Sequence, residues 1–239
     1  YVVDGEKSYA FTIRWGQQTN TDDAEGDVIH ESDSRPSAQT IEDMLGNFTG
    51  IIKQVPPQFS AVKIDGKRAY AQARAGEDVK LSAREVDITS LALQQIDDDD
   101  HASFIMTCGK GTYVRALARD LAVAMGCFGH VSALRRLEVF PFSTDQMVSI
   151  DDLLASEGDV TALDDFLLSP IEALSSTTHI SVSEDLARRI SVGNAVLIRD
   201  RTIYDADQDI CAVHKGELLA IGRVEGGLFH PKRVLNQDL

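Results

Sequence analysis

In Cys108-Gly-Lys-Gly-Thr-Tyr-Val-Arg115-Ala-Leu-Ala-Arg119-Asp-Leu121, a glycine-containing turn leads directly into a helical pattern. The residues before the turn, 103–107, are rich in β-formers and predict a strand. After the turn, apolar residues recur at spacings of three and four, which predicts a buried helix face made of Val114, Leu117, Leu121 and Met125. Arg115 and Arg119 are four residues apart and share another face. Backbone amides at such a turn can hold an anion together with an arginine. The alternative is an ordinary strand, turn and helix with two solvated arginines.

Composition narrows the class of protein. The chain has 239 residues, 43% of them hydrophobic, which suffices for one large domain or for one large and one small domain. No apolar run approaches the length of a membrane span, so we expect no membrane association. Three cysteines without metal-type spacing predict reduced thiols in a cytoplasmic protein, with neither a disulfide framework nor a zinc site.

The charge distribution is uneven. A net charge of −15 argues on its face against nucleic acid as a partner. However, residues 53–84 hold seven basic residues against three acidic ones, and residues 108–136 hold five against one, so each stretch has a local charge of +4. Phosphate binding depends on such local basic surface more than on the total charge. The two stretches therefore favour an RNA partner, and two lysine-containing loops that merely stay solvated are the alternative.

The element pattern predicts an α+β fold with a mixed β-sheet flanked by helices over residues 1–175, and a small β-rich domain over residues 176–239. In the first part we expect strands at 7–15, 86–96 and 103–108, a polar loop at 16–26, a helix at 37–46 capped by Ser37, and two short acidic helices within 149–168. Pro-Pro and Asp-Gly signals predict an extended basic arm at about 55–76, ending in a short helix at 70–76.

The tail has its own signals. The sequence Ser181-Val-Ser-Glu184 predicts a capping box that starts a helix, and Gly193 is expected to end that helix. Short strands are expected near 195–198, 210–213 and 218–224.

Four motifs resemble those of the bacterial TruB family of tRNA pseudouridine-55 synthases, and they occur in the same order. They are Glu6-Lys-Ser-Tyr9 with Thr19-Asn-Thr-Asp-Asp23-Ala-Glu-Gly26, Val55-Pro-Pro-Gln-Phe-Ser-Ala-Val-Lys63 with Gly66-Lys-Arg68 and Tyr70, Gly109-Lys-Gly-Thr-Tyr113-Val-Arg115, and His130-Val with Leu134-Arg-Arg-Leu137. Together they cover roughly residues 6–140. The tail resembles, more weakly, the small PUA-like domain of these enzymes.

The resemblance implies a tRNA-processing isomerase, with a pseudouridine-synthase core and a PUA-like RNA-binding domain. Uridine at position 55 in the T-loop of tRNA would become pseudouridine by cleavage of the N-glycosidic bond, rotation of the base and attachment of C5 to C1′. This rearrangement needs no cofactor and no metal. The target base must be flipped out of its stack, at a cost of a few kcal/mol. The implied partner is the T-stem-loop of tRNA, no obligate protein partner is evident, and a monomer is expected.

Residue roles follow from matched motif positions. Tyr9 is implied to stack on the flipped base and to lie near C5, and Arg115 is implied to pair with a catalytic aspartate. Tyr113, Leu134 and Asp23 match positions near the substrate. The residues expected to contact RNA phosphates are Lys63, Lys67, Arg68, Arg74, Lys110, Arg135 and Arg136. The alternatives are a core aromatic for Tyr9, plain core for Leu134, an Asx cap for Asp23 and a satisfied structural histidine for His130.

The sequence departs from the family pattern at three places. Phe59 stands where a tyrosine is usual and Asn20 where an aspartate is usual, and both changes are mild. The nucleophilic aspartate of the family lies in a Gly- and Thr-containing motif upstream of the tyrosine strand, and no such motif occurs here. Since Asp4 has the wrong context and the chain starts at Tyr1, we expect several tens of N-terminal residues to be missing and this chain to be inactive.

Two other functions compete with catalysis. A non-catalytic tRNA-binding or tRNA-folding module would keep the basic arm and the tail domain and would need no aspartate. A structural protein without an RNA role fits poorly with two +4 stretches in an acidic chain.

Overall fold

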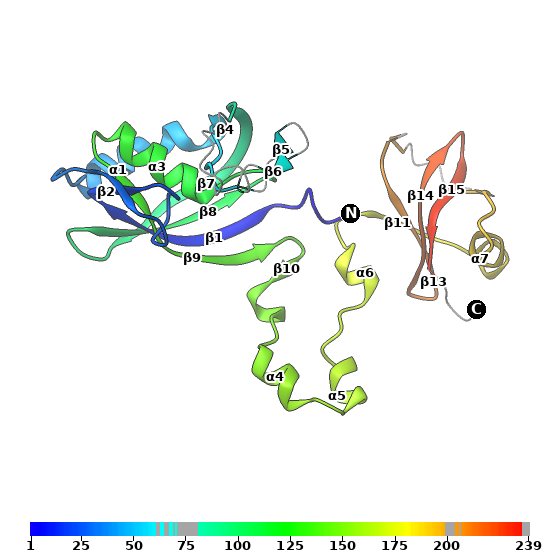
Figure 1. Cartoon of the computed structure of the whole chain (residues 1–239). Coiled ribbons are helices and arrows are strands. Elements are labelled where there is room, and N and C mark those ends of the chain that lie inside the picture. Colours follow the sequence, from blue (N-terminus) through cyan, green and yellow to red (C-terminus); the bar gives the residue numbers. More distant parts are fainter. Residues whose placement is uncertain are drawn as a thin grey trace. The chain divides into compact units, whose positions relative to one another are not determined.

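The computed structural model of the chain describes residues 1–60, 63–64, 67–68, 70, 81–198, 204–205 and 207–235 (Figure 1). The chain divides into two compact units. One is Val3–Asp145, and the other joins Tyr1–Val2 to Gln146–Leu239. Within the described ranges, no helix is both long and apolar enough to cross a membrane.

A six-stranded sheet with the order β10-β9-β1-β8-β7-β4 forms the centre of the first unit. Its strands are β1 (Lys7–Trp15), β4 (Gly50–Gln54), β7 (Arg84–Ile96), β8 (His101–Cys108), β9 (Gly129–Val139) and β10 (Phe142–Ser143). The pairings described for this sheet are antiparallel. Alternate residues of β1, from Tyr9 to Trp15, are buried, so the predicted strand with one apolar face is confirmed.

Helix α3 (Val114–Ala124) follows the turn after β8 and covers the buried face of the sheet. Val114, Leu117 and Leu121 are buried, as the spacing of apolar residues predicts, and Met125 is partly buried against the same core. Gly129 at the start of β9 lies against Ala122, Ile13 and Trp15, so the helix and two strands meet there.

The predicted helix near 37–46 is α1 (Ala38–Leu45), and the Ser37 side chain accepts a hydrogen bond from the backbone N–H of Thr40. A short 3-10 helix, η1 (Gly46–Phe48), follows it. The predicted polar loop at 16–26 differs from the structure, because β2 (Gln17–Thr19) pairs with β3 (Val28–Glu31). The turn between these two strands carries Asp22 and Asp23.

The predicted arm is only partly described. β5 (Lys63–Ile64) pairs antiparallel with β6 (Lys67–Arg68), and the side chains of both strands lie outside the description. Arg74 also lies outside the described residues, and of the predicted helix at 70–76 only Tyr70 is described. The arm and its basic side chains therefore stay a prediction.

The second unit contains a five-stranded sheet with the order β11-β13-β14-β15-β12. Its strands are β11 (Thr178–Ser181), β12 (Val196–Leu197), β13 (Ile210–His214), β14 (Glu217–Glu225) and β15 (Leu228–Val234). β11 and β13 run parallel and the other pairs antiparallel, so this is a mixed sheet. Sheets and helices in both units confirm the α+β class, and the predicted tail strands correspond to β12, β13 and β14.

Short helices complete the second unit. They are η2 (Thr144–Gln146), which crosses the division, α4 (Ile150–Ala155), α5 (Val160–Asp164), α6 (Pro170–Ala173) and α7 (Glu184–Ser191). The compact units divide between Asp145 and Gln146. The five-stranded sheet itself lies within the range 176–239 predicted for the small domain.

The capping box predicted at Ser181–Glu184 is wrong. Ser181 is the last residue of β11, where its backbone pairs with Val213, and the N-cap residue of α7 is Ser183. Pairing with the parallel strand β13 keeps the Ser181 backbone extended within β11. The helix cap therefore lies two residues later, at Ser183. A capping box does occur upstream, between Ser169 and Glu172 at the start of α6.

Two glycines give a matched test of packing in the first unit. A Cβ at Gly129 would lie 3.0 Å from Ala122 Cβ and 3.1 Å from Ile13 Cγ2, so Gly129→Ala should destabilise this unit by about 1–3 kcal/mol. Gly46 has a helical φ of −59° and open space around its Cα, so Gly46→Ala should stabilise the unit by about 0.4–1 kcal/mol. Trp15 is the single tryptophan and is buried in this unit, so its fluorescence during urea unfolding measures both effects. Equal unfolding midpoints for the two variants would contradict this account.

Candidate functional site

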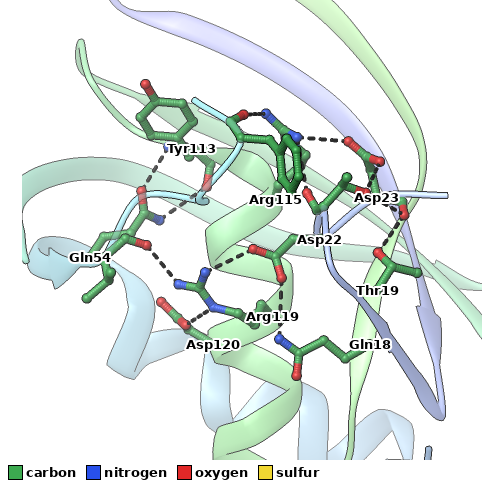
Figure 2. Close-up of polar contacts among 12 residues, drawn as sticks. Gln18, Thr19, Asp22, Asp23, Gln54, Tyr113, Arg115, Arg119 and Asp120 are labelled. Carbon is green, nitrogen blue, oxygen red and sulfur yellow. Dashed lines mark hydrogen bonds and ion pairs between the residues drawn. The ribbon is translucent and has the colours of Figure 1, made fainter. Parts of the chain in front are cut away.

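Arg115 lies in the first turn of α3 and joins two loop segments (Figure 2). Its Nη1 donates to the Thr21 carbonyl at 3.1 Å and to Asp23 Oδ2 at 2.9 Å. Its Nη2 donates to the Phe59 carbonyl at 2.9 Å. One guanidinium therefore fixes the β2–β3 turn and the segment after β4 to the start of the helix.

Asp23 has two structural roles at once. Its Oδ1 accepts from the Thr21 hydroxyl at 2.6 Å and from the Glu25 backbone N–H at 3.1 Å, which is the Asx turn that the sequence left as an alternative. Its Oδ2 meets Arg115. The turn therefore fixes the carboxylate in the orientation in which it receives the guanidinium.

Arg119 repeats this arrangement one helical turn further along (Figure 2). Its Nη1 donates to Asp22 Oδ2 at 2.9 Å and its Nη2 to the Val55 carbonyl at 2.8 Å. Its Nε donates to the neighbouring Asp120 at 2.8 Å. The sequence indicated only that Arg115 and Arg119 share a helix face, and it gave no sign of these partners.

The position of Asp22 is energetically unfavourable for a charged residue, because it is buried and its backbone is in the left-handed region. Its side chain is nearly buried and its φ is 61°, in the left-handed region that aspartate tolerates better than most residues. Burial raises the pKa of the Asp22 carboxyl, and the nearby Arg119 guanidinium opposes that shift. Gln18 contributes a longer hydrogen bond of 3.4 Å to Oδ1.

This raised pKa predicts a pH dependence of stability. A carboxyl whose pKa is higher in the folded than in the unfolded chain binds protons more tightly when folded. Its contribution to the free energy of unfolding therefore falls as the pH rises from the ordinary pKa of 3.8 towards the raised value. We expect the wild-type protein to lose stability relative to Asp22→Asn across this window and to show no further relative change above it.

The measurement is urea unfolding of both proteins, followed by Trp15 fluorescence, from about pH 4 to pH 7. Asparagine also tolerates a left-handed φ, so the variant removes the titration and keeps the turn. A stability difference that stays constant with pH, or that shifts in favour of the wild type, would contradict the assignment.

Gln54 is a buried residue that the sequence did not single out. Its Oε1 accepts from the Tyr113 backbone N–H at 2.9 Å, and its Nε2 donates to the Tyr113 carbonyl at 3.2 Å. Arg84 lies over the Tyr113 ring, 5.7 Å from its centroid. The end of β4 therefore anchors Tyr113 at the point where α3 begins.

Tyr9 and Arg136 share the sheet face that α3 covers. Tyr9 lies opposite Arg136 in the β1–β9 register, and the Arg136 guanidinium lies 5.3 Å from the centroid of the Tyr9 ring. This is a cation–π arrangement. Tyr9 is only 8% exposed and belongs to the core cluster, so it packs as a core aromatic and is also a site candidate.

The two remaining site candidates on β9, Leu134 and Arg135, lie on opposite faces of the sheet. Leu134 lies opposite Phe11 and is 50% exposed, so it is not part of the core. Arg135 pairs with Ala10 on the other face of the sheet from Arg136. The structure therefore does not bring these two arginines together.

Lys110, a predicted RNA contact, and His130, to which the sequence assigned no chemistry, also have partners. Lys110 pairs with Asp4, and both side chains are largely exposed. His130 is buried, and its Nδ1 donates to the Gln17 carbonyl at 2.8 Å, as expected for a satisfied structural histidine. The three cysteines are free and buried.

Comparison with known proteins gives consistent matches. The model of the N-terminal domain of TruB family pseudouridylate synthases matches residues 1–114, and that of the C-terminal domain of tRNA pseudouridylate synthase B matches residues 115–175. Proteins named tRNA pseudouridine synthase B from Rhizobium johnstonii and Agrobacterium fabrum are each 50% identical over 240 residues, which cover 98% of this chain and 77% and 76% of theirs.

Two solved structures are similar in fold. One is a Cbf5-Nop10-Gar1 complex, with a TM-score of 0.70 and 18% identity over 97% of this chain and 67% of the matched chain. The other is an H/ACA RNP bound to a substrate RNA containing 2′-deoxyuridine, with a TM-score of 0.72 and 14% identity over 99% of this chain and 68% of that one.

Proposed function

The chain belongs to the TruB family of tRNA pseudouridine synthases, and from this premise we propose that it acts on uridine 55 in the T-loop of tRNA. The proposal rests on the motif positions and on one structural observation. Arg115 gathers the β2–β3 turn, the segment at Phe59 and the start of α3 into one polar cluster. Such a cluster provides a fixed cation beside the helix N-terminus, as a carboxylate nucleophile requires.

The proposed reaction is an intramolecular rearrangement. The bond between C1′ and N1 breaks, the base rotates, and C1′ bonds to C5. C5 loses its proton and N1 gains one, so atoms and electrons balance without a co-reactant. The base must leave its stack before this happens, and an aromatic platform offsets part of the unstacking energy.

In this proposal Arg115 orients the nucleophilic carboxylate. A guanidinium carries five N–H donors, so it can hold Thr21, Asp23 and Phe59 and still receive a further carboxylate. Tyr9 supplies the stacking ring and lies near C5. Leu134 is half-exposed, which suits contact with an extruded base. Tyr113 and Asp23 are assigned to the substrate site from their motif positions.

Binding of the T-stem-loop is assigned to the basic residues. Arg136 and Lys110 are exposed in the first unit, and the arm residues Lys63, Lys67, Arg68 and Arg74 together with Arg135 complete the proposed set. Contacts with phosphates make the affinity fall with rising salt. Shape recognition of the T-loop supplies specificity, because an A-form helix hides its base edges. We place the reaction in the cytoplasm.

We infer further that no carboxylate among residues 1–239 acts as the nucleophile. The Gly- and Thr-containing motif that the resemblance implies for the nucleophile does not occur in the sequence, and Asp23, which pairs with Arg115, is already held in an Asx turn. Residues 1–239 alone should therefore bind the T-stem-loop and leave its uridine unchanged.

Two experiments test these statements. Deletion of the gene that encodes this chain should abolish pseudouridine 55 in cellular tRNA, as mapped by carbodiimide labelling and primer extension; persistence of the modification would refute the assigned position. Incubation of residues 1–239 with T-stem-loop RNA tritiated at C5 should give binding without tritium release. Release would show that the nucleophile is present, and binding together with unchanged tRNA in the deletion strain would favour a non-catalytic tRNA-binding module.

A further inference from the structure

We propose that Arg119 is a positioning residue, which holds Asp22 and Val55 in place and thereby sets the geometry of Arg115. Arg115 and Arg119 lie on successive turns of α3 and connect the same two segments to the helix (Figure 2). Arg115 contacts Asp23 and Phe59, whereas Arg119 contacts Asp22 and Val55. The partners of Arg119 therefore lie one and four residues before those of Arg115.

The Asp22–Arg119 pair is the more buried of the two ion pairs. The side chains of Asp22 and Arg119 are 7% and 18% exposed, against 24% and 25% for Asp23 and Arg115. Desolvation offsets most of the attraction in a buried ion pair, so such a pair contributes little net stability compared with a well-packed apolar pair. Its main effect is to fix geometry, because removal of one partner leaves a buried charge.

The segment that follows β4, residues 55–59, is held in place by hydrogen bonds from Arg119 and Arg115. Pro56 and Pro57 have no backbone N–H, so hydrogen bonds from their own amides cannot hold this stretch. A cavity of about 250 Å³ lies between the segment and the β2–β3 turn, lined by Asn20, Asp22, Val55, Gln58 and Arg119 among others. The carbonyls of Val55 and Phe59, which accept from Arg119 and Arg115, therefore fix the two ends of the segment.

The geometry of Arg115 follows from these constraints. Its acceptors Asp23 and Phe59 are set by the turn and by the segment. Arg119 holds Asp22, next to Asp23, and Val55, at the other end of the segment that carries Phe59. Loss of Arg119 should let Val55 and Asp22 move, so that Arg115 exchanges among orientations. A misplaced catalytic group of this kind lowers function without unfolding the protein.

The test uses residues 1–239 and two readouts. In the wild type, restricted rotation of the Arg115 guanidinium should give separate ¹⁵N signals for Nη1 and Nη2 in NMR spectra. The double variant Asp22→Asn/Arg119→Met removes both charges, so no unpaired buried charge remains to unfold it. We expect its Arg115 Nη signals to merge while its affinity for T-stem-loop RNA stays within about threefold of the wild type, because Arg115 is turned towards protein acceptors.

Two more variants complete the design. Arg119→Lys keeps the charge but its single nitrogen cannot span Asp22, Asp120 and the Val55 carbonyl, so the Arg115 signals should still merge. Arg35→Met is the control, because Arg35 also joins a carboxylate, Asp100, to backbone carbonyls, and it should leave the Arg115 signals separate.

The outcomes separate this inference from the proposed function. Separate Arg115 signals in the double variant, or in Arg119→Lys, would overturn the positioning role. Merged signals in Arg35→Met would overturn it too, since they would reflect general loosening of the unit. The affinity readout rests on the proposed function: if the wild type binds no T-stem-loop RNA, the proposed function fails while the NMR result still decides the role of Arg119.

Discussion

Arg115→Lys is expected to lower the rate of pseudouridine formation by about 100-fold or more in the catalytically active protein, if the proposed function is correct. Arg115 has acceptors on two segments, Asp23 Oδ2 and the Phe59 carbonyl, both at 2.9 Å. A planar guanidinium reaches both and can still orient a carboxylate, whereas an ammonium carries its three donors on one nitrogen. The substitution keeps the charge, so the loss reflects geometry.

Single-turnover release of tritium from C5 of the target uridine measures this rate, and the affinity for the same RNA is measured in parallel. We expect the affinity to change by less than about threefold, because the guanidinium is turned towards protein acceptors. Arg188→Lys is the matched control, since Arg188 forms an exposed i,i+4 pair with Glu184 on α7 and should leave the rate unchanged. A rate for Arg115→Lys within threefold of the wild type would show that charge alone suffices at this position.

The parts of the fold that could be predicted are those in which a short-range pattern of apolar residues indicates which side chains are buried. Alternation along β1 and the spacing of Leu117 and Leu121 in α3 each place one face of an element in the core, and the structure confirms both. Local rules failed where a partner distant in sequence competes for the backbone. Ser181 has the pattern of a helix cap, but its pairing with Val213 makes it the end of a strand.

The candidate site was predictable in part. Arg115 and Asp23 emerged from motif resemblance, although their direct pairing joins residues 92 apart and no local pattern encodes it. Asp22 looked like one more acid in a polar loop, because burial of a charge depends on the arginine that approaches from α3. No sequence pattern pointed to Gln54 as a site residue. Its role is visible only in the structure, where its side-chain amide contacts the Tyr113 backbone.

Tyr9 is expected to contribute strongly to RNA binding, and this can be measured on residues 1–239. If a flipped base stacks on the ring, Tyr9→Leu should weaken T-stem-loop binding by about 1–3 kcal/mol, which is roughly 5- to 150-fold in Kd. Leucine is apolar and fits a position that is 8% exposed, and Trp15 fluorescence checks that the unit stays folded. Tyr9→Phe keeps the ring and its contact with Arg136, so its affinity should stay within about twofold of the wild type.

The salt dependence separates stacking from phosphate contact. Tyr9→Leu should lower the affinity equally at all salt concentrations and leave the slope of log Kd against log salt unchanged, because no phosphate contact is lost. Arg136→Met, which removes the cation next to the ring, should reduce that slope by about one if Arg136 binds a phosphate. A reduced slope for Tyr9→Leu, or equal affinities for Tyr9→Leu and Tyr9→Phe, would refute the stacking role, since aromatic character would then not matter at this position.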